Sequence, residues 1–116
     1  MATKIPLNFF RRVSKAVTNT DQPIYTCPDE RAGIIISAYA TNTTNTTQTV
    51  NVKLSTDGVT SSMYTIVSAL PILPNDAVNV TINKIVLSEQ DVFIVSAENN
   101  NAVNVNLSIL ESINTP

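Results

Sequence analysis

The stretch Val103-Asn104-Val105-Asn106-Leu107-Ser108-Ile109-Leu110 alternates apolar and polar side chains up to Ile109, and only its last residue is apolar out of turn. Successive side chains of an extended strand point to opposite faces, so this stretch predicts a strand with one buried face and one wet face. The same period of two recurs over residues 50–55 and 78–83. Together these three stretches favour an all-β fold.

Denser apolar runs over residues 32–40, 63–73 and 92–97 are rich in Ile, Val, Tyr and Phe. Such runs predict strands that are covered on both faces. Turn-forming groups separate the runs, and Asp57-Gly58 between two of them is the clearest hairpin signal. Pro71 and Pro74 bracket residues 72–73, which we expect to cross from one sheet to another.

The spacing of runs and turns predicts seven or eight short strands, the rhythm of an all-β domain. We therefore expect an antiparallel β-sandwich, Greek-key or jelly-roll-like, over residues 19–116. The 116 residues suffice for one such domain but not for two. We expect a separate N-terminal docking arm over residues 1–18.

The first fifteen residues carry four of the seven positive charges and two of the three phenylalanines. From Ala16 onward three cations stand against nine acids, a net charge of −6. Residues 7–17 suit about two turns of amphipathic helix, marginal in isolation, and an extended arm suits them equally. The side chains that we expect to dock on a partner are Ile5, Leu7, Phe9, Phe10, Arg11, Arg12 and Lys15.

A protein partner fits this arm best, because Phe9-Phe10 supplies apolar area and Arg11-Arg12 can pair with carboxylates. Nucleic acid usually requires a longer basic stretch, and the acidic body would repel it. A membrane would require a larger apolar face with Trp at the interface. The expected partners are therefore copies of the chain and other proteins. The alternative is an arm that folds back to cover an edge of its own sandwich, and removal of residues 1–15 would leave a folded body if the arm is separate.

The composition argues against catalysis and against bound cofactors. The chain has no His or Trp, a single Cys27 and only two glycines, so a triad, a P-loop and a dinucleotide fingerprint are all ruled out. We expect Asp29-Glu30 and Glu89-Gln90-Asp91 to be solvated turn acids rather than a metal site. We therefore predict no enzyme, and no catalytic, cofactor-binding or metal-binding residues.

Charged residues make up only 14% of the chain, with Asn and Thr in their place. A polar surface with few ions suits close packing against copies or neighbours, although an AT-rich genome would produce the same composition. The competing function is a glycan-binding module that uses the loops near residues 42–47 and 99–101. Sugar sites usually present exposed aromatics, and Tyr25, Tyr39 and Tyr64 all lie in strand-like runs where packing is expected instead.

The order of cues along the body resembles a group of short virion structural proteins of tailed bacteriophages, notably marine contractile-tailed ones. The cues are "TVNVKLSTDG" from residue 49, "LPILPND" from residue 70, "INKIVLSEQDVFIVSA" from residue 82 and "AVNVNLSILE" from residue 102. Gln90 stands where those proteins usually have glycine. The resemblance implies a small accessory or decoration protein, made in the host cytoplasm and present in many copies on the capsid, neck or tail of the virion.

Overall fold

The computed structural model describes residues 8–56, 63–81 and 84–113, and every regular element in these ranges is a strand. The described ranges contain nine strands rather than the seven or eight predicted for residues 19–116, and one of the nine lies within the predicted arm, over residues 8–16. They are β1 (Asn8–Ala16), β2 (Gln22–Thr26), β3 (Arg31–Asn42), β4 (Gln48–Ser55), β5 (Met63–Ile72), β6 (Ala77–Asn79), β7 (Ile85–Leu87), β8 (Val92–Ala97) and β9 (Val103–Ile113).

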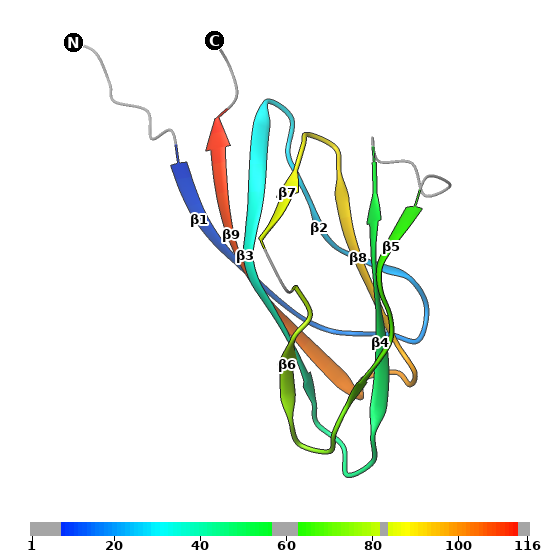
Figure 1. The fold of residues 1–116 in the computed structure, drawn as a ribbon. Coiled ribbons are helices and arrows are strands. Elements are labelled where there is room, and N and C mark those ends of the chain that lie inside the picture. Colours follow the sequence, from blue (N-terminus) through cyan, green and yellow to red (C-terminus); the bar gives the residue numbers. More distant parts are fainter. Residues whose placement is uncertain (1–7, 57–62, 82–83, 114–116) are drawn as a thin grey trace, which may run out of the picture.

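Two antiparallel sheets contain all of these strands (Figure 1). Sheet A has the order β1-β9-β3-β6, with β7 also paired to β3, and sheet B has the order β2-β8-β4-β5. The pairing is nested: the first strand pairs with the last, the second with the next to last, and β4 with β5. Consecutive strands therefore alternate between the sheets in the first half of the chain, and β1 and β2 lie at the same side of the molecule.

The core lies between the sheets and draws on both of them. The alternating stretch over residues 103–110 lies in β9. Its apolar residues Val103, Val105, Leu107 and Ile109 are all buried. Their polar neighbours along the strand are exposed or half-buried. The strand predictions for residues 103–110 and 50–55 are therefore confirmed. Of the predicted stretch 78–83, Val78 and Asn79 lie in β6, residues 80–81 lie outside the strands, and residues 82–83 are not among the described residues.

The dense apolar runs behave unequally. Residues 92–97 form β8, an inner strand of sheet B that is buried on both faces, as predicted. Residues 63–73 largely form β5, and the expectation that both of its faces are covered is wrong. β5 is an edge strand of sheet B whose outer side has no second layer, so Tyr64 and Ile66 are exposed.

The crossing predicted beside Pro71 and Pro74 is confirmed in outline. β5 ends at Ile72 in sheet B, and β6 begins at Ala77 in sheet A. The hairpin predicted at Asp57-Gly58 lies outside the described residues, although β4 and β5 on either side of it do pair antiparallel.

Over its described part, from residue 8 onward, the N-terminal segment is neither helical nor separate from the body. Residues 8–16 form β1, which pairs with β9 in an unbroken register from Asn8↔Ser112 to Ala16↔Asn104. A distinct N-terminal arm is therefore not confirmed. The physical reason is that β9 offers a full-length edge to pair with, and Val13 of β1 packs against the core.

Candidate docking surface

β1 is held to the body by a buried carboxylate. The Glu111 side chain on β9 is fully buried, and its Oε1 accepts hydrogen bonds from Arg11 Nε and Arg31 Nη1, each at 2.7 Å. Its Oε2 accepts a hydrogen bond from the Tyr25 hydroxyl on β2. One carboxylate thus joins β1, β2, β3 and β9, and both of its oxygens are paired.

Neighbouring groups complete this cluster. The Arg31 guanidinium lies 4.5 Å from the centre of the Phe9 ring, a distance suited to a cation–π contact. Gly33 leaves the space that the tyrosine occupies, because a Cβ there would stand 3.3 Å from Tyr25 Oη. The buried Cys27 lies beside them, and burial raises the pKa of its thiol. We read this cluster as structural, since every buried polar side-chain atom in the described ranges has a partner.

The electrostatics of the cluster favour the ionised carboxylate. Burial alone raises the pKa of the Glu111 carboxyl, but hydrogen bonds from Tyr25, Arg11 and Arg31 outweigh burial, and the pKa lies below its ordinary value. Burial and the hydrogen bond to Glu111 raise the pKa of the Tyr25 hydroxyl, so the tyrosine stays neutral as a donor.

Acid should therefore weaken the fold through Glu111. A carboxyl with a depressed folded pKa contributes stability that is complete above its unfolded pKa of about 4.3 and is lost as pH falls through the lower folded value. We expect the urea concentration at which half of the native chain is unfolded to decrease as the pH is lowered below about 4. Glu111→Gln should remove much of this dependence of the urea midpoint on acid pH. Glu98→Gln, at an exposed site, should keep it. An unchanged dependence in Glu111→Gln would contradict the assignment.

The alternation of β1 divides the predicted docking residues between two faces. Directly paired residues share a face, and Phe9 and Arg11 pair with the buried Glu111 and Ile109, so both point to the inner side. Phe10 and Arg12 point to the outer side, where Phe10 is 81% exposed. Phe9 and Arg11 thus contribute to the fold of the chain itself.

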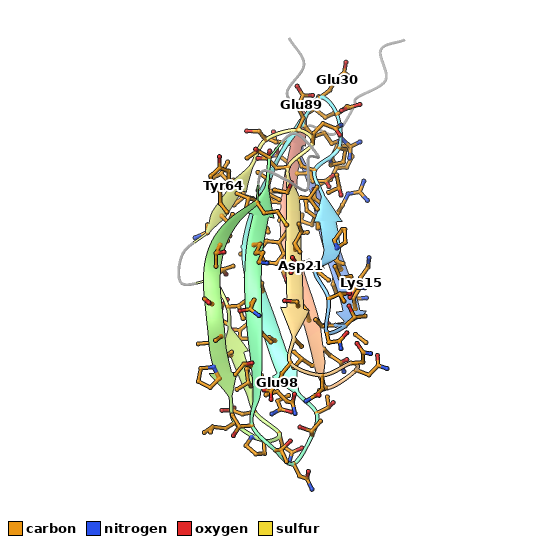
Figure 2. The ribbon with its side chains drawn as sticks, turned by 90° about the vertical axis from the view of Figure 1, so that its right-hand side faces the viewer. Lys15, Asp21, Glu30, Tyr64, Glu89 and Glu98 are labelled. Carbon is orange, nitrogen blue, oxygen red and sulfur yellow. The ribbon has the colours of Figure 1, made fainter. Side chains whose placement is uncertain are left out.

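The three remaining docking residues have different outcomes. Lys15 shares the inner side of β1 by alternation, yet its side chain extends into solvent and, among the described residues, reaches the Pro23 carbonyl at 3.4 Å (Figure 2). Ile5 and Leu7 lie outside the described residues. Of the docking residues that the structure describes, Phe10, Arg12 and Lys15 are the ones placed for contact with a partner.

An apolar row crosses the outer face of sheet A at Phe10. In register, Phe10 is opposite Leu110, Leu110 is opposite Ile34, and Ile34 is opposite Val86. Val86 is 66% exposed, and the two inner members are half-buried. We call these four side chains the apolar row. No sequence pattern predicted it, because its members come from four separate strands.

The turn acids meet at one end of the molecule, where Figure 2 shows Glu30 beside Glu89. Glu89 accepts a hydrogen bond from the Glu30 backbone N–H, Asp29 accepts one from the Gln90 side chain, and Asp91 accepts one from the Ser88 N–H. Asp91 is nearly buried, whereas the other acids are exposed. The carboxylates of Glu89 and Asp91 therefore cap backbone N–H groups of turns, and that of Asp29 binds a side chain.

The conformation of Gln90 matches its place in that turn. Its φ is 71°, in the left-handed region that glycine adopts most readily. This is the position at which the resemblance leads one to expect glycine. A hydrogen bond from the Gln90 N–H to the Cys27 carbonyl holds the residue in this conformation.

The features expected of a glycan site give a mixed result. All three tyrosines lie in strands, as expected, but only Tyr25 is buried in the core, whereas Tyr39 and Tyr64 are 48% and 62% exposed. These two tyrosines belong to different sheets and form no common platform. Three side-chain amides of the Asn-rich loops make internal hydrogen bonds: Asn42 donates to the Thr46 and Ile72 carbonyls, Asn99 donates to the Gln48 side chain, and Asn100 accepts from the Asn19 N–H.

Within the described ranges, no three His, Cys, Asp or Glu side chains gather in a way that could hold a metal ion. The described residues also include no helix long and apolar enough to cross a membrane. Comparisons with protein-family models, with curated proteins and with solved structures found no match to this chain.

Proposed function

We propose that this chain is a non-enzymatic structural component of a tailed-phage virion, a small β-sandwich that docks on the capsid, neck or tail through the outer side of β1. The observation that carries the docking assignment is the apolar row, which presents Phe10 and Val86 to solvent on an open sheet face. Exposed apolar side chains that adjoin across strands mark interaction surfaces more often than singly scattered ones do. Arg12 lies on the same outer side of β1 as Phe10 and supplies a cation at the rim.

The topology supports the structural role by analogy. Nested pairing of first with last strand is the arrangement of the jelly roll, a fold that builds many viral capsid domains and also many lectins. Because a fold alone does not decide function, the topology leaves both candidate functions open and the surface must choose between them.

The surface favours docking over glycan binding. Three side-chain amides of the candidate sugar loops are used for internal hydrogen bonds, and the two exposed tyrosines lie on separate sheets. The apolar row has no such internal use. Its low charge also suits contact between copies, because few ions must lose their water when two such faces meet.

Detection of the chain in purified particles, by mass spectrometry and immunogold labelling, tests the proposed location. The double variant Phe10→Ser/Val86→Ser should keep the native melting temperature within a few degrees, since both side chains are largely exposed. It should lose about tenfold or more of its occupancy on particles, as truncated aromatic anchors do.

Tyr64→Ser is the matched control for this experiment, because Tyr64 is 62% exposed on the other sheet. Its occupancy on particles should equal that of the native chain. Absence of the chain from particles would overturn the virion assignment. Equal occupancy for the double variant and the control would overturn the docking face.

A further inference from the structure

We infer that the free edge of β1 accepts an extended acidic segment of a partner protein as an additional strand of sheet A. This inference rests on the proposed docking role and specifies its chemistry: main-chain hydrogen bonds supply the attachment, and carboxylates supply the selectivity. Addition of a strand to an open sheet edge is a recurrent mode of peptide recognition.

β1 is the one long and regular edge among the strands of the described ranges. β2 carries a register shift next to Pro23, and β5 carries two shifts together with Pro71. β6 and β7 have three residues each. By contrast, β1 runs for nine residues without a shift and pairs only with β9 in the described part of the chain, as its place at the margin of sheet A in Figure 1 shows. Bulges, prolines, shortness and charged side chains are the usual means of protecting an edge, and β1 uses only the last of these, in Arg11, Arg12 and Lys15. Such charges repel a second cationic strand but not an acidic one.

The hydrogen-bonding register shows which backbone groups remain open. Val17 N donates to Val103 O at 2.9 Å, just beyond the pair Ala16↔Asn104. Since the direction of the backbone groups alternates along a strand of an antiparallel pair, the N–H groups at Val17 and every second residue before it face β9. The residues whose N–H and C=O groups face away from β9 are Phe10, Arg12, Ser14 and Ala16. These groups form the hydrogen-bonding edge for an added strand.

The charge of β1 identifies the occupant. Arg11, Arg12 and Lys15 fall within nine residues that contain no acid. Only Arg11 is paired with a carboxylate, and Arg12 has no hydrogen bond or ion pair to any described residue. A second copy of β1 would place three cations against three cations, and like charges opposite one another destabilise a sheet. An acidic segment would be attracted at the same positions.

An open hollow beside the edge leaves room for its side chains. It has a volume of ≈ 450 Å³ and lies between β1 and β2, with Arg11, Arg12, Tyr25 and Thr26 among its lining residues. A strand added to β1 would extend sheet A past this hollow. Its inward side chains would stand beside Arg11 and Lys15, and its outward ones beside Phe10 and Arg12. An antiparallel partner should therefore carry acidic residues opposite Arg12 and Arg11, followed by an apolar residue opposite Phe10.

A synthetic peptide tests this inference directly. The probe has nine residues, with glutamate opposite Arg11, Arg12 and Lys15 and leucine opposite Phe10; a scrambled peptide of the same composition is its control. In amide NMR spectra of the full chain, the probe should shift and protect the N–H groups of Phe10, Arg12 and Ser14. The scrambled peptide should bind about tenfold or more weakly, because its charges fall out of register.

Two variants separate backbone pairing from charge. Ser14→Pro removes one outward N–H, which an added strand needs for pairing, and should abolish binding of the probe. The variant should still fold, because an edge strand accepts proline at a position whose N–H would face solvent. Ser14→Ala keeps that N–H, loses the same side-chain bond to Asn106, and should bind like the native chain. Arg12→Glu alters no backbone group and should weaken probe binding by about tenfold or more. It provides an independent measurement if Ser14→Pro fails to fold.

Three results would overturn the inference. The probe does not bind, or the scrambled peptide binds as tightly as the probe, or the Arg12→Glu chain binds the probe as tightly as the native chain does. Failure of the inference differs from failure of the proposed function. If particle docking depends on Phe10 but the probe does not bind, strand addition is wrong and the docking face stands. If the probe binds but the chain is absent from particles, the virion assignment fails while β1 keeps its edge chemistry.

Discussion

Glu111→Ala should lower the free energy of unfolding by about 3–5 kcal/mol, the usual cost of removing one partner of a buried ion pair. The substitution leaves Arg31, which is three-quarters buried, without its carboxylate, and it leaves the Tyr25 hydroxyl without an acceptor. It also releases Arg11, which ties β1 to the body. Chemical denaturation at neutral pH measures the loss.

Two variants make that measurement specific. Glu98→Ala removes an exposed acid whose one side-chain contact is a 3.4 Å hydrogen bond from Thr49, and it should change stability by no more than about 0.5 kcal/mol. Arg11→Ala should cost less than Glu111→Ala, because the Arg11 side chain is 49% exposed and Glu111 would keep Arg31 and Tyr25. A Glu111→Ala chain as stable as the Glu98→Ala chain would contradict the anchoring role.

Strand periodicity carried most of what the sequence could predict. β9 follows its period-two pattern closely because one face is buried and the other is not. β4 follows its pattern as far as Lys53, but beyond it Leu54 is half-buried and Ser55 is buried. β8 reads as a continuous apolar run because it lies inside sheet B. β5 has much the same composition but lies at an edge, and composition alone does not distinguish an inner strand from an edge strand.

The sequence did not identify β1 as a strand of the body because its inward positions are not uniformly apolar. Phe9, Arg11, Val13 and Lys15 share the inner side, and two of these four are cations, so the strand has no clear apolar alternation. The adjacent Phe9-Phe10 and Arg11-Arg12 suggested a single docking anchor. In the structure each doublet is split, one member toward the body and one toward solvent. The alternative of an arm that covers an edge of its own sandwich came closer, since β1 covers the edge of β9.

Glu111 illustrates a signal that was present in the sequence and could have been used. It is the next residue in the alternating series Val105, Leu107 and Ile109, whose side chains are buried. The alternation therefore places a carboxylate on the inward face of the strand. A charge at such a position requires a buried partner. The partner could not be identified from the sequence, because Arg11 and Arg31 are 100 and 80 residues away along the chain.

Deletion of residues 1–16 should abolish cooperative folding rather than leave an intact body. The deletion removes β1, so it exposes the pairing edge of β9 along nine residue positions and uncovers the core beside Val13. It also takes Arg11 from the buried Glu111. These losses together are comparable to the about 5–15 kcal/mol that holds a whole domain folded. Circular dichroism and size-exclusion chromatography should show lost structure and association, since an open apolar edge recruits other chains.

A deletion that ends at residue 7 is the matched control, because it leaves every residue of β1 in place. The comparison changes how the docking role must be tested. Loss of particle binding after removal of residues 1–15 would follow from unfolding alone, whatever the arm does. The Phe10→Ser/Val86→Ser variant avoids this ambiguity, since both of its side chains lie on the solvent side of sheet A. A deletion of residues 1–16 that melts cooperatively near the native temperature would show instead that the body folds alone, as a separate arm requires.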